Sequence, residues 1–374
     1  MKSHVMWNSM PQQIVNDISK VQLLNETPDN MLVTVEVFKP ADTYIERLTF
    51  TESILNEIYT FLSSHYTNHD SKILVYSKKL LTFFFNSGET SILLALRKKD
   101  TNDMIGFISG VYKNIRCKTI QKFCYVDFLC IHKDYRSTYI AAYLITQLWT
   151  YVQKTPAIFH TFRNLPRAIC KQHIYVRPLN LEKLVKDNCF EIPHGFSKKT
   201  YCEELEKIFS LVRPKSPYSI TRCNPSDVHQ VCDKLNEFNK RKFVIYPLIK
   251  HETIMEIIQN TDFMTFKLTN EHNSIIAYMD VYILTTYQNS IECKNAYMYN
   301  TFHSCDWSEK EVGDFLIKVL IKLRDDGIDI ITIQSHIDTH LQLQKFMIKG
   351  SISTHIFNHS MIQLQSENNG LVPF

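Results

Sequence analysis

The sequence predicts a mixed α/β fold in which one layout of helices and strands occurs twice. The first observation is the length of 374 residues, which is more than a single hydrophobic core usually supports. The second is that apolar residues follow the same order of elements on either side of the proline-bearing stretch 212–217. We therefore expect an N-terminal domain over residues 1–205 and a C-terminal domain over residues 206–374.

The first copy starts with a helix whose apolar residues, among them Ile54, Ile58 and Phe61, recur at helical spacing. Two short apolar strands follow, one on each side of a polar turn. A longer strand then leads into a second amphipathic helix and a last strand. These six elements are predicted at residues 52–66, 92–96, 104–111, 123–131, 139–152 and 158–161.

The second copy repeats this order after Asn224-Pro225, a favourable cap and first residue for a helix that carries Val228 and Leu235 on one face. The opening of its second helix, at 306–311, holds three acidic residues. Acidic residues suit a helix start but repel a phosphate, so we expect only the first copy to bind an anionic cofactor. The remaining elements are predicted at residues 264–268, 275–284, 296–302, 308–324 and 328–334.

The bulk composition is that of an ordinary globular chain, with 44% hydrophobic and 21% charged residues. The net charge of +4 comes without a long basic run, so no nucleic-acid partner is expected. Apolar runs stay well short of the roughly 20 residues that span a membrane, so no stable membrane insertion is expected. A weakly positive cleft would suit an anionic ligand.

The ten cysteines form no C-x-x-C pair, and the first residues lack the apolar core of a signal peptide. We therefore expect free thiols and a cytoplasmic location. Two histidine pairs, His336 with His340 and His355 with His359, have helical metal-ligand spacing. Neither pair has the glutamate of the zinc-protease motif, so no metal is expected.

The most informative stretch is an apolar strand at 126–131 that runs through a short loop into a helix beginning near residue 140. A helix start fed by a strand offers unpaired backbone N–H groups and the positive end of the helix dipole. Both features suit a pyrophosphate. Arg136, in the loop, adds a positive charge at the same place.

The residues of this stretch resemble the signature of the N-myristoyltransferase family, Glu-Ile-Asn-Phe-Leu-Cys-Val-His-Lys followed by Arg-Ser-Lys-Arg-Val-Ala. Further short matches lie at separate points along the chain. The stretches that carry the resemblance are Phe128-Leu129-Cys130-Ile131-His132-Lys133, Arg136-Ser137, Gly106-Phe107-Ile108-Ser109, Leu165-Pro166 and Gly370-Leu371-Val372.

The resemblance implies two fused GNAT-like domains that form a saddle-shaped sheet with pseudo-two-fold symmetry and flanking helices. It also implies transfer of a myristoyl group from myristoyl-CoA to the N-terminal glycine of proteins or peptides, by a monomer without a metal. The abundance of Asn, Ile and Lys is compatible with a virus-encoded member.

The resemblance assigns roles to individual residues. For catalysis it implies the backbone amides of Phe128 and Leu129 as donors to the acyl carbonyl, the terminal carboxylate of Phe374 as base, and Thr161 as a partner of the amine. The implied acyl-CoA contacts are Val5, Met6, Trp7, Phe128, Leu129, Cys130, Ile131, Arg136, Ser137, Thr138, Tyr139, Ile140 and Ala141. The implied peptide contacts are Tyr66, Asp70, Tyr76, Tyr175 and His303.

The chain also departs from the family pattern. Asp127 replaces the asparagine of the signature, Tyr125 replaces its glutamate, and Tyr139 stands where the family has a basic residue. An acidic run and a glycine-rich loop of the acceptor half are rewritten, the latter with Lys349. We therefore expect a weaker preference for basic acceptor peptides than the family shows.

Two other functions remain open at this point. One is a GNAT acyltransferase with another acyl chain or amine acceptor. The other is a degenerate protein that binds acyl-CoA or glycine peptides without turnover. The altered acceptor loops favour the second alternative, whereas the retained Gly370-Leu371-Val372 argues against it.

Overall fold

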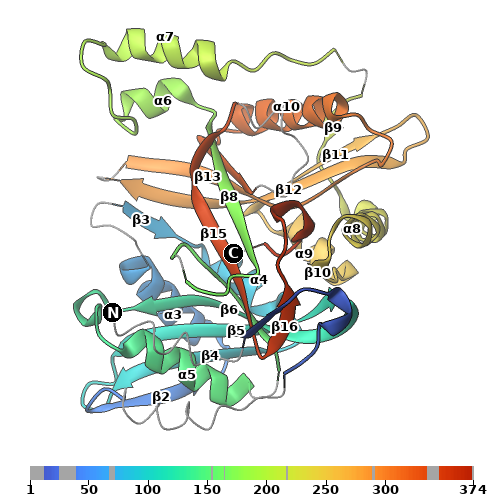
Figure 1. Cartoon of the computed structure of the whole chain (residues 1–374). Helices are drawn as coiled ribbons and strands as arrows, with labels where there is room; N and C mark the ends of the chain where they lie inside the picture. Colours follow the sequence, from blue (N-terminus) through green and yellow to red (C-terminus); the bar gives the residue numbers. More distant parts are fainter. Residues whose placement is uncertain are drawn as a thin grey trace.

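The computed structural model describes most of the chain and confirms a mixed α/β fold with flanking helices (Figure 1). The described residues are 12–24, 39–66, 72–152, 155–163, 165–215, 218–288, 291–334 and 345–372. Five of the predicted site residues lie outside these ranges: Val5, Met6, Trp7, Asp70 and Phe374.

Fourteen of the described strands form one continuous sheet, and two more form a small parallel pair. The strands are β1 (Gln12–Val15), β2 (Thr43–Leu48), β3 (Lys72–Val75), β4 (Ser91–Lys98), β5 (Met104–Cys117), β6 (Thr119–Ile131), β7 (Ala157–Thr161), β8 (Cys170–Pro178), β9 (Ile220–Thr221), β10 (Ile245–Pro247), β11 (Phe263–Thr269), β12 (Ile275–Gln288), β13 (Ile291–His303), β14 (Ile330–Gln334), β15 (Met347–Phe357) and β16 (His359–Ile362). The main path of the sheet is β2-β4-β5-β6-β7-β15-β8-β14-β13-β12-β11-β9.

Eight α-helices flank this sheet in the described part of the chain. They are α3 (Glu52–His65), α4 (Lys78–Asn86), α5 (Ile140–Val152), α6 (Leu181–Lys186), α7 (Lys198–Phe209), α8 (Val228–Lys242), α9 (His251–Gln259) and α10 (Glu309–Asp325). None of the described helices combines the length and the apolar character that crossing a membrane requires.

The predicted repeat is present in the structure. In the first half β4, β5 and β6 are antiparallel, α5 follows, and β7 returns parallel to β6. In the second half β11, β12 and β13 are antiparallel, α10 follows, and β14 returns parallel to β13. Figure 1 shows α5 lying over the first set of strands and α10 over the second. All twelve elements predicted from apolar periodicity are therefore found.

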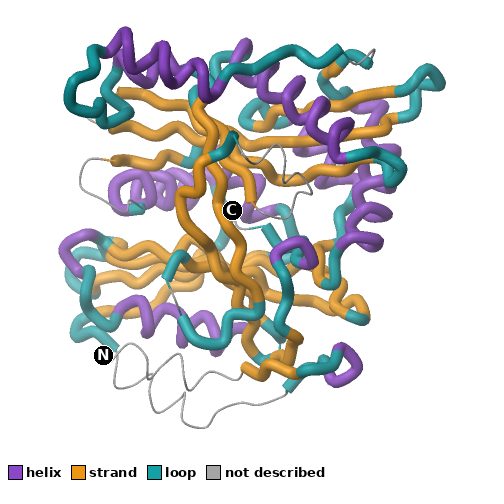
Figure 2. Tube along the Cα trace, turned by 45° about the horizontal axis from the view of Figure 1, so that its top comes forward, coloured by secondary structure: helices purple, strands orange, loops and turns teal. Residues whose placement is uncertain are grey.

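The two halves exchange strands at the centre of the sheet. β15 comes from the end of the chain but pairs with β7 on one side and β8 on the other. β8 comes from the first half but pairs with β14 of the second. Figures 1 and 2 show β8 and β15 crossing from one half to the other. The sheet thus passes the division predicted at residue 205 without a break.

Helix starts are fixed by local chemistry. Ser308 caps α10 and exchanges hydrogen bonds with Glu311, whose carboxylate accepts from the Ser308 backbone N–H at 2.7 Å. The Glu311 carboxylate thus occupies the N-terminus of α10, which would otherwise be available to a phosphate. The start of α5 has no acidic residue in its first turn. The difference between the two copies that the sequence predicts is therefore present in the structure.

The largest core cluster belongs to both halves at once. It joins buried side chains of α3 and α4 from the first half to those of α8 and α9 from the second. The three phenylalanines Phe83, Phe84 and Phe85 of α4 lie at its centre, fully or almost fully buried. Because neither half can bury these rings alone, we expect the halves to fold as one cooperative unit.

Three buried histidines indicate how the free energy of unfolding should change at acidic pH. Burial lowers the pKa of His160 to about 3 and that of His355 to about 4, and it also lowers the pKa of His359. In the unfolded chain these groups take up protons below about pH 6.5, whereas in the fold they remain neutral. Their contribution to stability is therefore present above pH 6.5 and is lost as the pH falls toward 4.

We predict that His355→Phe reduces this loss. His355 stacks on Phe159 with ring centroids 4.8 Å apart, and its Nε2 is buried without a hydrogen-bond partner among the described residues. The free energy of unfolding, measured with urea between pH 7.5 and 4.5, should depend less steeply on pH, by up to about 1.4 kcal/mol per pH unit. The exposed His194 gives the matched control, His194→Phe. Equal slopes for the parent and the His355 variant would contradict the prediction.

Candidate active site

A β-bulge interrupts β6 at the family-like signature. Phe107 pairs with Cys130 and Ser109 pairs with Asp127, so Phe128 and Leu129 together oppose the single residue Ile108 of β5. Phe128 adopts a φ of +53°, a left-handed conformation that a bulky residue rarely takes. The bulge therefore turns the peptide groups of Phe128 and Leu129 away from the regular ladder.

Aromatic packing holds the bulge in this conformation. The Phe128 side chain is 1% exposed and lies among aromatic rings from three other elements. Its ring centroid is 5.1 Å from that of Tyr76, 5.4 Å from Phe85 and 6.0 Å from Tyr66. Leu129, by contrast, is 36% exposed. The structure thus brings together Phe128, Leu129, Tyr66 and Tyr76 of the predicted site.

One of the two backbone N–H groups predicted to donate to the acyl carbonyl already donates to the Asp127 side chain. The backbone N–H of Phe128 donates to Asp127 Oδ1 at 2.7 Å. An acyl carbonyl could use that N–H only after displacing the carboxylate. The role of the Phe128 and Leu129 amides in binding the carbonyl stays a prediction, and the replacement of asparagine by Asp127 bears on it directly.

Asp127 also lies within an unusually aromatic, low-dielectric environment. Burial raises the pKa values of Tyr66, Tyr76 and Tyr125, and the nearby Asp127 carboxylate raises them further. These phenols remain protonated near neutral pH. They therefore offer hydroxyl groups as hydrogen-bond donors and not as bases.

The end of the chain is held beside the same strand. The Tyr125 hydroxyl donates to the backbone carbonyl of Val372 at 3.1 Å. Gly370 fits closely here, because a Cβ at this position would lie 2.6 Å from the Phe243 ring, and its N–H donates to Ile245 at 2.9 Å. Val372 is the last described residue, so the tethered segment ends two residues before Phe374.

Thr161 ends β7 on the strand that runs parallel to β6. Val126 pairs with Phe159, and both strands continue in the same direction, so Thr161 lies at the level of the bulge. Its hydroxyl oxygen accepts from the N–H of Arg163 at 3.0 Å. Thr161 thus lies at the level of the bulge with one lone pair already engaged, and its role toward the amine stays a prediction.

Two predicted acceptor-site residues lie apart from this group. Tyr175 is on β8, opposite Ile333 of β14, and packs against the core cluster of the second half. His303 ends β13, where its ring lies 5.2 Å from that of Phe238. Sequence matching alone selected both residues, and the structure does not bring them to the bulge.

The predicted acyl-CoA contacts gather at the start of α5. Residues 136–139 are exposed, and Ser137 has a φ of +64°, which bends the chain just before the helix. The Arg136 guanidinium donates to the backbone carbonyls of His65 and Ile131. Arg136 therefore stiffens the loop as well as adding positive charge.

Cys130 lies inside the signature but is poorly suited to be a nucleophile. It is 3% exposed, and burial raises the pKa of its thiol to about 12. The thiolate is the reactive form, and very little of it exists near neutral pH. We interpret Cys130 as a packing residue of the bulge.

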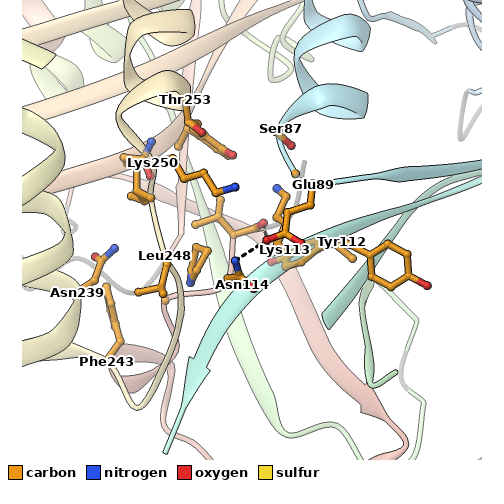
Figure 3. Close-up of a pocket in the computed structure, with 18 of the residues that line it drawn as sticks. Ser87, Glu89, Tyr112, Lys113, Asn114, Asn239, Phe243, Leu248, Lys250 and Thr253 are labelled. Carbon is orange, nitrogen blue, oxygen red and sulfur yellow. Dashed lines mark hydrogen bonds between the residues drawn. The ribbon is translucent and has the colours of Figure 1, made fainter. Parts of the chain in front are cut away.

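A pocket with about 900 Å³ of free space, open mouth included, adjoins the tethered chain end (Figure 3). Its walls come from the far end of β5, from residues 247–250 before α9, from β13 and from residues 370–372. Lys113 and Lys250 line it, and the sequence analysis singled out neither. The sequence signal that could have indicated Lys113 is a lysine within the apolar stretch that forms β5.

One group of metal-ligand type occurs among the described residues. Donor atoms of Cys232, Asp233 and His251, on α8 and α9, lie within 4.8 Å of one another. The Cys232 thiol already donates to the backbone carbonyl of Ile249 at 3.3 Å, and burial raises its pKa to about 11. This cluster is separate from the bulge, and the expected absence of a metal stays a prediction.

Comparison with known proteins agrees with these features. The fold is closely similar to that of Saccharomyces cerevisiae N-myristoyltransferase solved with bound myristoyl-CoA, with a TM-score of 0.83 and 16% identity over 99% of this chain and 97% of that chain. The family profile "Myristoyl-CoA:protein N-myristoyltransferase, N-terminal domain" matches residues 24–171.

Curated relatives extend the similarity. Bos taurus glycylpeptide N-tetradecanoyltransferase 2 is 24% identical over 85% of this chain, and the match spans 66% of the relative's length. A putative glycylpeptide N-tetradecanoyltransferase of Amsacta moorei entomopoxvirus is 34% identical over 36% of this chain and spans 46% of that protein. The solved structure thus shows that the chain has the fold of N-myristoyltransferases. The N-terminal part of the chain is thus similar to N-myristoyltransferases, and the whole chain shares their fold.

We predict that Arg136→Glu weakens myristoyl-CoA binding roughly tenfold. The change removes a cation from the start of α5, adds an anion there and breaks two hydrogen bonds that stiffen the loop. Titration calorimetry with myristoyl-CoA measures the effect. The corresponding helix start of the second copy provides the control, Lys310→Glu, which should leave the affinity unchanged. If both variants bind myristoyl-CoA equally well, the coenzyme does not bind at the start of α5.

Proposed function

We propose that this chain transfers a myristoyl group from myristoyl-CoA to the α-amine of proteins that begin with glycine. The observation that carries the proposal is the β6 bulge at Phe128 followed within a few residues by the exposed start of α5. The bulge offers amide donors for a carbonyl, and the helix start offers amide donors for phosphates. One acyl thioester of coenzyme A can use both at once.

The reaction forms a carbon–nitrogen bond and breaks a carbon–sulfur bond. The neutral glycine amine attacks the thioester carbonyl, whose oxygen gains negative charge near Phe128 and Leu129. The tetrahedral intermediate then expels the thiolate of coenzyme A. The nitrogen loses one of its two protons to a base during this sequence and keeps the other in the amide, and the released proton passes to the leaving thiolate or to solvent.

We propose the chain's own terminal carboxylate as that base. Tyr125 tethers Val372 beside β6, so the last two residues start from the neighbourhood of the bulge. A peptide α-amine has a pKa of about 8, so a weak base that is well positioned suffices. Thr161, at the end of β7, could then orient the amine.

A second candidate function is binding of acyl-CoA or glycine peptides without turnover. The specific observation in its favour is the hydrogen bond from the Phe128 N–H to Asp127, which occupies a donor that catalysis would use. A carboxylate next to a developing oxyanion also raises the energy of the transition state. Turnover therefore separates the two proposals more sharply than binding does.

A transfer assay tests both functions together. Labelled acetyl-, myristoyl- and palmitoyl-CoA are each incubated with a panel of glycine-led peptides and with matched alanine-led peptides. We expect myristoyl transfer to glycine peptides alone. Binding of myristoyl-CoA without transfer would support the non-catalytic alternative, and transfer of a different acyl chain would replace the proposed substrate.

We predict that extending the chain beyond Phe374 abolishes turnover and preserves myristoyl-CoA binding. An extension converts the terminal carboxylate into a neutral amide, while the coenzyme contacts lie at α5. The control is a self-cleaving fusion that, once processed, leaves Phe374 as the last residue and should restore activity. Full turnover by the extended protein would eliminate the terminal carboxylate as base.

A further inference from the structure

Helices α8 and α9 carry a cluster of metal-ligand side chains that lies outside the candidate active site. The two helices pack against each other, and their buried residues belong to the largest core cluster (Figure 1). Cys232 and Asp233 are consecutive on α8, and His251 is the first residue of α9. The fold thus brings a thiol, a carboxylate and an imidazole together from positions that are far apart in the sequence.

The donor atoms of this cluster are spaced almost as they would be around one ion. One donor atom each from Cys232, Asp233 and His251 lies within 4.8 Å of the other two. Within the group, Asp233 Oδ1 is 3.5 Å from His251 Nε2. Ligands about 2.0–2.3 Å from one tetrahedral zinc ion are themselves roughly 3.3–3.6 Å apart. The oxygen and the nitrogen therefore already have this separation, and a shift of about 1 Å brings in the sulfur.

The state of His251 Nε2 is a second, independent observation. This atom is buried although 43% of the His251 side chain is exposed, and it has no hydrogen-bond partner among the described residues. Asp233 is close enough for an ion pair with a protonated ring, but the two side chains form no hydrogen bond. A buried polar atom without a partner costs free energy, and coordination of a metal by the nitrogen lone pair removes that cost.

Asn236 fixes the position of His251 relative to α8. Its Nδ2 donates to the Ile249 carbonyl at 2.8 Å, and its Oδ1 accepts from the Ile249 N–H at 3.0 Å. Ile249 lies two residues before His251, so two hydrogen bonds hold the α9 ligand beside the α8 ligands. Asn236 Nδ2 also lies 3.6 Å from Cys232 Sγ, as a donor that a thiolate can keep. Such outer contacts orient metal ligands and raise the affinity of a site.

A hollow beside the cluster gives an ion access from solvent. It has about 930 Å³ of free space, open mouth included, and His229, His251, Glu252 and Glu256 are among the residues that line it. The carboxylates of Asp233 and Glu252 both lie near enough to the Cys232 thiol to act on its pKa. Their negative charge favours the approach of a cation.

We propose that Cys232, Asp233 and His251 bind one zinc ion that joins α8 to α9. A mixed set of sulfur, nitrogen and oxygen donors suits zinc, whereas magnesium and calcium take oxygen ligands. The thiol loses its proton to solvent when the thiolate coordinates the ion. Water takes the fourth position, because no further histidine, cysteine or carboxylate of the described residues belongs to the group. For this part of the chain the proposal replaces the sequence-based expectation that no metal binds, and it does not depend on acyl transfer.

Cobalt(II) is the probe that tests the site directly. Its complexes absorb visible light, and a thiolate ligand adds a charge-transfer band in the near ultraviolet. The full chain, reduced and freed of metal with a chelator, is titrated with Co²⁺ and then with Zn²⁺. We expect one Co²⁺ per chain, a thiolate charge-transfer band, and displacement of the cobalt by zinc. Absence of the thiolate band from the parent protein would overturn the proposal.

Three ligand variants and two controls locate the ion. Cys232→Ser, Asp233→Asn and His251→Gln should each weaken binding by at least about tenfold, and Cys232→Ser should also abolish the charge-transfer band. Asp233 is exposed, so its variant remains informative if Cys232→Ser unfolds. The controls Cys305→Ser and His272→Gln remove the same ligand types from exposed positions outside the cluster.

Both controls should bind cobalt as the parent does. If the three ligand variants bind as tightly as the controls, the metal binds only to scattered surface thiols and histidines, and the proposal is overturned.

Thermal unfolding provides a readout that needs no spectroscopic probe. Zinc at one hundred times its Kd should raise the Tm of the parent by roughly 2–4 °C, because it binds the folded state and links two helices of the core. A chelator should reverse the shift, and Asp233→Asn should lack it. An equal shift in parent and Asp233→Asn would contradict the proposal. Neither readout requires turnover, so failure of the metal site leaves the proposed function untouched, and absence of acyl transfer leaves the metal site untouched.

Discussion

The bulge at Phe128 depends on aromatic rings of the first half, and two rings of the same cluster, Phe83 and Phe84, pack in turn against Phe263 and Tyr282 of the second half. A non-glycine residue at a φ of +53° is strained by roughly 1–3 kcal/mol, and such strain persists only where surrounding contacts overdetermine the conformation. Those contacts are rings of α4 and of the segments around Tyr66 and Tyr76, within the cluster that also contains α8 and α9. The amide groups at the centre of the candidate site are therefore oriented by the joint core of both halves.

The exchange of β8 and β15 fixes the same arrangement through the backbone, because each half supplies a strand to the sheet of the other.

The charges around the bulge form one coupled system. Asp127 accepts from the Phe128 N–H, acts on the buried Lys113 and lies two residues from Tyr125, which tethers the chain end. Replacing a neutral amide by a carboxylate at this position adds a negative charge to a low-dielectric site. The neighbouring Lys113 supplies the opposite charge. The departure from the family pattern at Asp127 and the presence of Lys113 thus have a shared electrostatic explanation, since each reduces the cost of burying the other.

Sequence reasoning found the elements whose side chains separate cleanly into apolar and polar faces. The repeat, α3, α5, α10 and their strands follow from periodicity alone. The apolar pattern did not predict β8 and β15. Their buried faces contain polar residues that interrupt the pattern: Gln172, Arg177, Thr354 and His355. α4 has five apolar residues among its nine and lacks a distinct polar face, so its periodicity is weak. The bulge could be located from the signature, but its aromatic support and the pocket beside the chain end could not. Tyr76 reaches Phe128, and Lys113 and Lys250 come to line one pocket, only after the sheet has assembled.

The two binding functions of this site differ in how they depend on sequence. A coenzyme phosphate bound, as proposed, at the start of α5 would be met mainly by backbone N–H groups. These groups persist when Tyr139 replaces a basic residue, provided that the strand, loop and helix keep their geometry. An acceptor bound, as proposed, near the bulge would instead be met by side chains, among them the phenols of Tyr66 and Tyr76. Single substitutions can reverse the charge of such a surface without disturbing the sheet. Acceptor-binding side chains can therefore diverge between similar proteins while the fold and the backbone groups at a helix start are kept.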